Sequence, residues 1–180
     1  AGISVSDGET IHTRRGQGLV SEVFSRDEYL EFEGNQAIGH VRYTTAGDSG
    51  LLNAQPLVFR YTGGQVAVAH NGNLVNAKRL RDQLERQGSI FQTNSDTEVV
   101  SHLIARAGPP IDHAFQDALR VIDGAYALLL MTEKQMIAAQ DPRGFRPLSL
   151  GQFENAWVVS SETCALNTIG ADFVLSLIHI

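Results

Sequence analysis

The stretch from Val66 to Leu74 constrains the fold of this chain more than any other part of the sequence. Its first four residues, up to Ala69, are small or β-branched and predict a buried strand. Asn71 and Gly72 tolerate backbone angles that most residues avoid, so we expect the strand to stop sharply there, before an amphipathic helix. A side-chain amide beside an unhindered N–H could donate two hydrogen bonds to one oxygen. The alternative is an ordinary hairpin turn, which Asn-Gly often forms.

The order of the other predicted elements indicates an α+β fold. Strands come as hairpins on both sides of a group of helices, and alternation of single strands with single helices is not seen. Ser25 with Glu28, and Ser95 with Glu98, have the spacing of capping boxes that open helices. The predicted strands are 3–5, 11–13, 37–41, 57–60, 65–69, 125–131, 136–139, 148–150 and 157–159, and the predicted helices are 19–24, one from Ser25, 74–87, one from Ser95, 112–122 and 162–169.

Composition excludes several classes of protein. The 180 residues fit one domain, and the apolar share of 43% with a charged share of 19% is ordinary for a soluble globular protein. A net charge of −6 with scattered basic residues argues against nucleic acid as the main partner. No apolar run is long enough to span a membrane, so no membrane partner is predicted.

Cysteine and histidine give no pattern for a metal site. The six histidines have no zinc-like spacing with one another or with Cys164, the single cysteine. One cysteine excludes an internal disulfide and suits the cytoplasm. Cys164 lies near the start of a predicted helix, where a thiolate is favoured, so it is either a reactive thiol or a packed small side chain.

Three polar residues could together form a site for a free amino acid. Arg42 ends a predicted strand and could hold a carboxylate through two parallel hydrogen bonds, or simply face solvent. Asp96 could receive an ammonium group, or favour the first turn of its helix. With Asn71 they would supply an anion clamp, a cation clamp and an oxyanion hole, which suits an α-amino acid that has a side-chain carbonyl.

Four ordered motifs carry a resemblance to a known family. They are Gly39 to Gly47 (GHVRYTTAG), Ala69 to Leu74 (AHNGNL), Ser95 to Val99 (SDTEV) and Asp141 to Leu148 (DPRGFRPL). This series resembles the amidophosphoribosyltransferases, which are class II glutamine amidotransferases, from Ala1 to about Phe173. The resemblance implies an N-terminal-nucleophile hydrolase fold, a four-layer αββα sandwich of two mainly antiparallel sheets, here incomplete at the N-terminus.

The resemblance also implies roles for single residues. Arg42 would bind the α-carboxylate of glutamine, with Thr45 nearby, and Asp96 would bind the α-ammonium. The side chain of Asn71 and the N–H of Gly72 would form the oxyanion hole. In this family glutamine is hydrolysed through a thioester, and the ammonia passes to phosphoribosyl pyrophosphate to give 5-phosphoribosylamine, at the first committed step of de novo purine synthesis.

The sequence departs from the family at both ends. Ala1 is not the cysteine with which the mature chains of the family begin, and residues 1–3 match a segment downstream of it, so we expect a fragment that lacks the nucleophile. We expect a glutaminase domain over 1–173 and a tail over 174–180 that differs from the family. No cofactor is expected in the fragment, whereas Mg²⁺ is expected in the phosphoribosyltransferase domain of a homo-oligomeric, cytoplasmic parent; an iron–sulfur cluster in that parent is left open.

Two other interpretations remain open. One is the glutaminase domain of another class II amidotransferase, which would feed a different acceptor. The other is a glutamine-binding module without catalytic activity.

Overall fold

The computed structural model of the chain describes residues 1–25, 32–42 and 50–176. Its elements are β1 (Gly2–Ser6), β2 (Ile11–Arg15), α1 (Val20–Val23), β3 (Gln36–His40), the 3-10 turn η1 (Leu51–Asn53), β4 (Leu57–Tyr61), β5 (Gly64–Leu74), α3 (Ala77–Arg86), α4 (Thr97–Ala107), α5 (Ile111–Val121), β6 (Gly124–Thr132), β7 (Met136–Gln140), β8 (Ser149–Phe153), β9 (Ala156–Ser160), α6 (Thr163–Ile169) and β10 (Asp172–Ser176).

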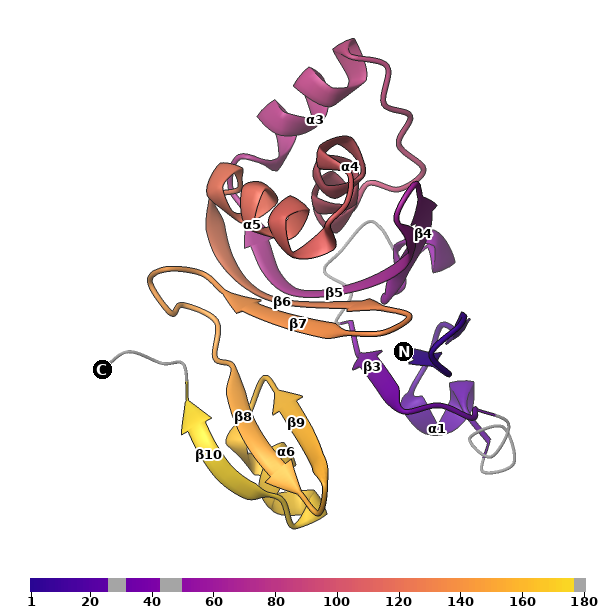
Figure 1. Cartoon of the computed structure of the whole chain (residues 1–180), viewed down its shortest axis with the longest axis vertical. Coiled ribbons are helices and arrows are strands. Elements are labelled where there is room, and N and C mark those ends of the chain that lie inside the picture. The colour runs from indigo at the N-terminus through magenta and orange to yellow at the C-terminus, as the bar shows by residue number, and fades with distance from the viewer. Residues whose placement is uncertain (26–31, 43–49, 177–180) are drawn as a thin grey trace.

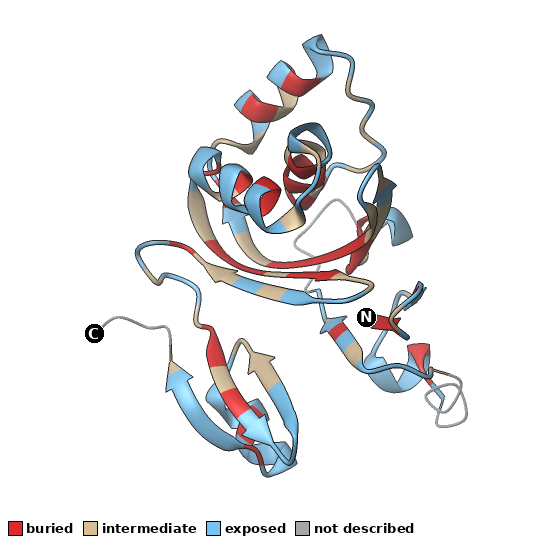
Figure 2. Cartoon of the chain, in the orientation of Figure 1, coloured by how far each residue is buried: buried red, intermediate tan, exposed pale blue. Residues whose placement is uncertain are grey.

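A four-stranded antiparallel sheet lies at the centre of the molecule, in the order β4-β5-β6-β7. Helices α3, α4 and α5 cover one of its faces (Figure 1). Each helix buries the side chains that recur at helical spacing, for example Leu80 and Leu84 of α3, and turns charged residues to solvent. Together with Val66 and Val68 of β5, these side chains form the main core, which makes the sheet and its helices one closed unit (Figure 2).

A second layer lies on the other side of the central sheet (Figure 1). It consists of two three-stranded antiparallel sheets, β2-β1-β3 and β10-β8-β9, and α6 packs on the latter through the fully buried Leu166. Strands β2 and β3 lie against β5 and β6, where Ile11 and Ile38 meet Ala67 and Ala69. The α+β class and the antiparallel layers are therefore as predicted.

Alternation along β5 decides which layer each side chain faces. Because successive residues of a strand point to opposite faces, Val66 and Val68 face the helices while Ala67 and Ala69 face the second layer. The same period directs His70 toward the helices and Asn71 toward the second layer. The side chains of His70 and Asn71 therefore lie on opposite faces of the central sheet.

The prediction that the strand stops at Asn71 and Gly72 is wrong, and so is the alternative of a hairpin turn. Strand β5 continues to Leu74, and both residues pair with β6, opposite Ala127 and Tyr126. Long-range pairing with β6 therefore overrides the local turn preference of Asn-Gly. Leu74 consequently ends the strand, and helix α3 begins three residues later than expected.

The two predicted capping boxes differ in outcome. The pair of Ser25 and Glu28 extends into residues 26–31, outside the described residues. Helix α4 begins after Ser95 as expected, but the Glu98 carboxylate accepts hydrogen bonds from the N–H groups of Gln92 and Thr93, at 2.8 and 2.7 Å. Glu98 therefore fixes the preceding loop and does not close a box with Ser95.

Two further findings limit what the fold can be. None of the helices in the described residues is long and apolar enough to cross a membrane. The same residues contain no group of three His, Cys, Asp or Glu side chains that could hold a metal ion.

Strand β10 runs from Asp172 to Ser176 beside β8, across the position where the sequence predicted a tail to begin.

Candidate functional site

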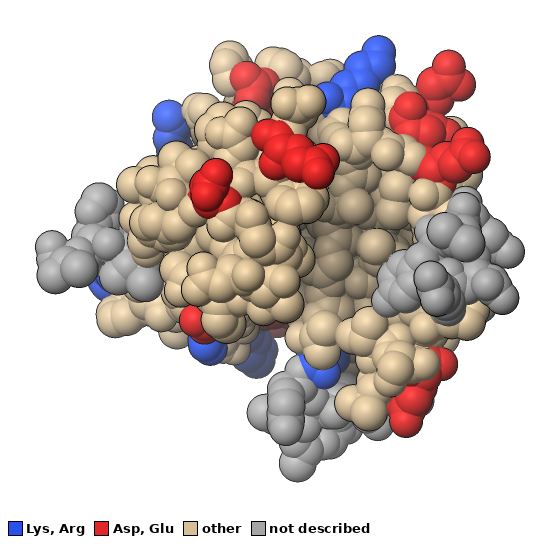
Figure 3. Space-filling view, turned by 90° about the horizontal axis from the view of Figure 1, so that it is seen from below, with Lys and Arg blue, Asp and Glu red and all other residues tan. Residues whose placement is uncertain are grey.

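A cleft of about 890 Å³ lies between the end of β5 and the second layer. Seen from below, the surface is hollowed between the lobe of β8–β10 and the lobe of β1–β3 (Figure 3). Residues from both layers line it: Gly39, His40, Val41, Arg42, Gln55, His70, Asn71, Gly72, Asn73, Asn94, Ser95, Asp96, Arg146, Ser161 and Glu162. The cleft is therefore built by six separate segments of the chain.

The cleft brings together four of the five site residues predicted from sequence, namely Arg42, Asn71, Gly72 and Asp96. Thr45 belongs to residues 43–49, which lie outside the described part of the chain. Cys164 is exposed on α6 and is not a lining residue. The described residues that line the cleft thus supply charged and amide groups but no thiol.

The open edge of β5 supplies backbone donors to the cleft. Strand β4 pairs with β5 only up to Val68, so the N–H groups beyond that point need other acceptors. The Gln55 side chain accepts from the N–H of His70 at 2.6 Å, and the Asp96 carboxylate accepts from the N–H of Leu74 at 2.9 Å. Alternate N–H groups of a strand point to the same edge. The N–H of Gly72 therefore points to the open edge, between the N–H groups of His70 and Leu74.

Only glycine fits at position 72. Its φ of +151° is one that L side chains rarely adopt, and a Cβ there would lie 2.0 Å from the carbonyl oxygen of Ala125. The close approach of β5 and β6 therefore requires a residue without a side chain. It also leaves the N–H of Gly72 unobstructed on its own edge.

Asn71 reaches toward the second layer. Its Nδ2 donates to the hydroxyl oxygen of Ser161, which follows β9, over 3.4 Å. This bond is long, so a ligand oxygen with better geometry could replace the hydroxyl as acceptor. Asn71 and Gly72 thus offer one amide and one backbone donor from adjacent residues.

Asp96 presents a partly buried carboxylate at the start of α4. Its Oδ2 accepts from Leu74, and its Oδ1 lies 3.5 Å from Nδ1 of His70. Burial alone raises the pKa of Asp96, but interactions with His70 and the N–H groups of Leu74 and Thr97 outweigh it and lower the pKa below its usual value. The carboxylate is therefore held in its charged form, ready for a cation.

Two clamps fix the loop that carries Asp96. The guanidinium of Arg81 donates to the carbonyl oxygens of Thr93 and Ser95, at 2.9 and 3.2 Å, and lies 4.0 Å from the ring centre of Phe91. From the other side, Glu98 accepts from the N–H groups of the same loop. The position of Asp96 thus depends on residues outside the cleft.

The two arginines of the cleft are positioned differently. Arg42 is exposed and has one long hydrogen bond among the described residues, from Nη1 to the carbonyl oxygen of Asn53 at 3.5 Å, so its guanidinium can turn to a ligand. Arg146 ends a loop that is folded around the buried Asp141. The Asp141 carboxylate accepts from the N–H groups of Arg143, Phe145 and Arg146, and although burial raises its pKa, these bonds lower it overall.

A network of hydrogen-bonded polar side chains forms part of the cleft wall. Nε2 of His40 is 3.0 Å from the carbonyl oxygen of His70, and Nδ1 of His70 is 3.2 Å from the hydroxyl of Thr97, which also accepts from Gln55 at 3.3 Å. A carbonyl only accepts, so we assign the His40 proton to Nε2. Nδ1 of His70 faces a carboxylate, and its Nε2 is buried without a partner among the described residues, so we assign the His70 proton to Nδ1.

Sequence reasoning missed several of these residues. His70 is next to a predicted site residue, but nothing local distinguishes a supporting histidine from a core one. Gln55 lay in a predicted loop, and Ser161 is 90 positions away from Asn71. Only the fold brings these side chains to one place.

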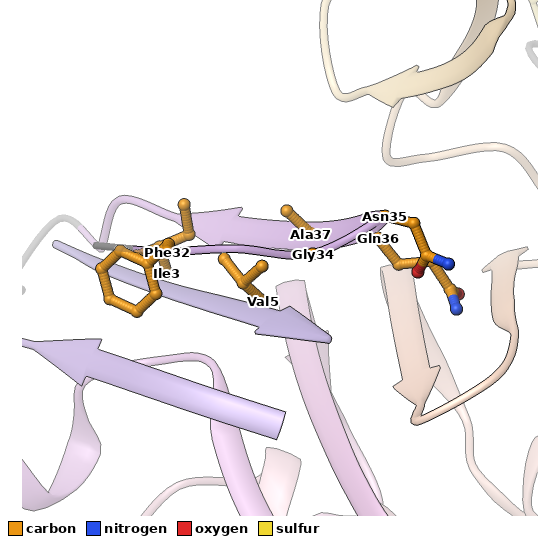
Figure 4. Close-up of a pocket in the computed structure, with 7 residues that line it drawn as sticks. All are labelled: Ile3, Val5, Phe32, Gly34, Asn35, Gln36 and Ala37. Atoms are coloured by element: carbon orange, nitrogen blue, oxygen red, sulfur yellow. The ribbon is translucent and has the colours of Figure 1, made fainter. Parts of the chain in front are cut away.

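A second hollow, of about 320 Å³, lies on the β1–β3 sheet and differs in chemistry. Figure 4 shows the side chains of Ile3, Val5, Phe32 and Ala37 along it, with the amides of Asn35 and Gln36 at one end. The described residues that line it carry no charged side chain and so offer no clamp for an amino acid.

Known proteins resemble this chain over most of its length. A family model described as a glutamine amidotransferase domain matches residues 40–168. Amidophosphoribosyltransferase of Bacillus subtilis is 53% identical over 97% of this chain and 37% of its own length. Amidophosphoribosyltransferase 2, chloroplastic, of Arabidopsis thaliana is 51% identical over 95% of this chain and 31% of its own length. The chain thus spans about a third of the length of these curated relatives.

Solved structures give the same grouping. Glutamine phosphoribosylpyrophosphate amidotransferase of B. subtilis, complexed with ADP and GMP, superposes with a TM-score of 0.91 at 51% identity, over 97% of this chain and 38% of that one. A structure described as the allosteric regulatory enzyme of purine biosynthesis gives 0.93 at 52% identity, with the same coverage. A predicted glutamine amidotransferase of Pseudomonas aeruginosa, 18% identical, shares the fold at 0.55 over 89% of this chain and 76% of its own.

Proposed function

Because the chain belongs to the family of glutamine amidotransferase domains, we propose that it is the glutaminase part of an amidophosphoribosyltransferase. The observation that carries this proposal is the meeting of Arg42, Asp96 and the Asn71–Gly72 pair in one cleft. A guanidinium, a carboxylate and a pair of amide donors match the three polar ends of free glutamine. The four residues come from segments far apart in sequence.

The binding step would use the two charged side chains. Arg42 is exposed at the cleft and takes the α-carboxylate, for which a guanidinium offers two parallel N–H groups. Asp96, held charged by its neighbours, takes the α-ammonium. Thr45 would lie near Arg42, as the family resemblance implies.

The chemical step would use the neutral donors. Attack on the glutamine carboxamide places negative charge on its oxygen, and donors aimed at that oxygen stabilise the transition state more than the ground state. The Asn71 amide points toward the second layer and the Gly72 N–H toward the open edge of β5, and both residues line the cleft. The attacking thiol comes from outside the described lining of the cleft, as in the family, where it belongs to an N-terminal cysteine.

In the full-length protein the released ammonia would pass to phosphoribosyl pyrophosphate and give 5-phosphoribosylamine for purine synthesis. This part of the proposal is supported by the names of the relatives, about two thirds of whose length lies outside the match. On the same resemblance we propose a cytoplasmic, homo-oligomeric glycosyltransferase, with Mg²⁺ bound in its phosphoribosyltransferase domain.

The test is a pair of substitutions in the full-length enzyme. Asn71→Ala should lower glutaminase turnover by about 10²–10³ and leave the KM for glutamine nearly unchanged, because it removes a donor used in the transition state. Arg42→Lys should raise the KM, because the planar pair of donors is lost while the charge is kept. Both constants come from steady-state assays of ammonia release.

Asn35→Ala is the matched control, since it removes an amide that lies in the hollow on the β1–β3 sheet and not in the cleft. It should leave both constants unchanged. Unchanged turnover in Asn71→Ala would remove Asn71 from the oxyanion role. If Arg42→Lys also abolished synthesis from free ammonia, the substitution would act on folding and not on glutamine.

A further inference from the structure

We propose that His70 is a positioning residue for substrate recognition: its Nδ1–H orients the Asp96 carboxylate toward the α-ammonium of glutamine. This inference rests on the function proposed above and assigns to His70 a part in binding, separate from the oxyanion donors beside it in sequence. His70 and Asn71 are neighbours whose side chains point to opposite faces of β5. Strand β5 therefore contributes both to the proposed ammonium site, through His70, and to the proposed oxyanion hole, through Asn71.

His70 is fixed on three sides. Its N–H donates to Gln55 at 2.6 Å, its carbonyl oxygen accepts from His40 at 3.0 Å, and its Nδ1 lies 3.2 Å from the hydroxyl of Thr97. The residue is 3% exposed, so protein surrounds its ring, and of the three contacts the one to Thr97 is made by the ring itself. A ring held in this way can impose a direction on the group that it faces.

The group that it faces is one oxygen of Asp96. Leu74 occupies Oδ2 at 2.9 Å, and Nδ1 of His70 lies 3.5 Å from Oδ1. Contacts of this kind are often long without a ligand and shorten when one is bound. Without the imidazole, Oδ1 would lose the neighbour that fixes the plane of the carboxylate. The carboxylate could then rotate about its Cβ–Cγ bond, with only Oδ2 held, by the N–H of Leu74.

The place of the ring proton suits this task. Nε2 of His70 is buried without a partner among the described residues, so we assign the donor to Nδ1. Nδ1 is the ring atom that lies beside Oδ1 of Asp96.

The experiment compares two substrates in the full-length enzyme. One is L-glutamine, and the other is glutaramic acid, which is glutamine without its α-amino group. His70→Leu removes the donor, whereas His70→Asn retains an N–H at nearly the same distance along the side chain. Ammonia release from each substrate gives kcat and KM for wild type and both variants.

We expect His70→Leu to raise the KM for glutamine about tenfold, with kcat changed by less than about threefold, because one charge-assisted contact is lost. Its kcat/KM for glutaramic acid should stay within about twofold of wild type, since that substrate has no ammonium for Asp96 to bind. His70→Asn should recover most of the glutamine KM. The preference for glutamine over its deamino analogue should therefore fall only when the donor is removed.

Three outcomes would overturn the inference. An equal fall in kcat/KM for both substrates would show that His70 supports the strand and not Asp96. An unchanged KM in His70→Leu, or no recovery in His70→Asn, would show that the Nδ1 donor does not matter. A wild-type enzyme that releases no ammonia from glutamine would instead refute the proposed function.

Discussion

The two sides of the cleft differ in how completely they are packed. Residues 66–69 of β5 are at most 4% exposed, because helices cover one face and the second layer covers the other. In β10, Phe173, Val174 and Leu175 are 53%, 48% and 48% exposed, and Trp157 of β9 is 65% exposed. The strand that supplies the amide donors therefore lies in the best-packed region, while the small sheets contribute single side chains such as Ser161.

Under the proposed function, this difference corresponds to a division of tasks. Donors for a transition state must be placed accurately before the reaction, which requires a rigid support. Side chains that only contact a bound ligand can come from less packed elements. Substitutions on the two sides should therefore have unequal effects.

The largest contrast is between two glycines in strands. Gly72→Ala places a Cβ 2.0 Å from a backbone oxygen at a φ of +151°, and should reduce the free energy of unfolding by about 4 kcal/mol or more. Gly151→Ala in β8 meets its nearest atoms at 3.0 Å, among them the flexible Leu166, and should cost about 1 kcal/mol. Denaturant unfolding measures both; equal losses would contradict a more rigid central sheet.

A smaller contrast comes from two leucines. Leu128→Ala leaves a cavity in the main core, where the side chain is 0% exposed, and should cost about 3 kcal/mol. Leu175→Ala removes a side chain that is half exposed on β10, and should cost less than about 0.5 kcal/mol. The same unfolding measurement applies, and a large loss in Leu175→Ala would show that β10 is covered in the full-length protein.

The smallest effect concerns His40, whose side chain links the two regions through the carbonyl oxygen of His70. Burial lowers the pKa of His40, with a further lowering from Arg42 and an opposing effect of that hydrogen bond. Below the unfolded pKa of about 6.5, the unfolded chain takes up a proton that the folded chain refuses, so stability falls as the pH drops below that value.

His40→Gln keeps a donor for the carbonyl oxygen but does not titrate. Between about pH 7 and 5, the free energy of unfolding of this variant should therefore fall less steeply than that of the wild type. The difference in slope corresponds to at most one bound proton. Unfolding curves over that pH range test this for both proteins. Identical slopes would show that His40 keeps its ordinary pKa in the folded chain.

The sequence was sufficient for elements whose pattern is local. Leu80 and Leu84 recur at helical spacing, and the hairpin from Leu57 to Ala69 has glycines in its turn, so the helix and the hairpin were both predicted, although β5 continues to Leu74 and α3 begins at Ala77. The residues Arg42, Asp96, Asn71 and Gly72 were also predicted, from motifs that resemble a family. The structure places these four residues along one cleft.

The sequence was insufficient where long-range pairing decides the outcome. Asn71 and Gly72 favour a turn, yet they continue a strand because β6, more than fifty residues later, pairs with them. A glycine inside a strand pattern can indicate close approach of another backbone, and that was the competing signal. The contacts of Gln55, His70 and Thr97 are visible only in the fold, because each depends on where β5 loses its partner β4.

The open edge of β5 has a consequence for how the length of this region can vary. Amide directions alternate along a strand, so adding or removing one residue between Ala69 and Leu74 would exchange the inward-facing and outward-facing groups all along the segment. The N–H of Gly72 would then point to β6 and away from the open edge. Length differences among related proteins should therefore gather in the turn at Thr62 and Gly63 and be absent from this segment.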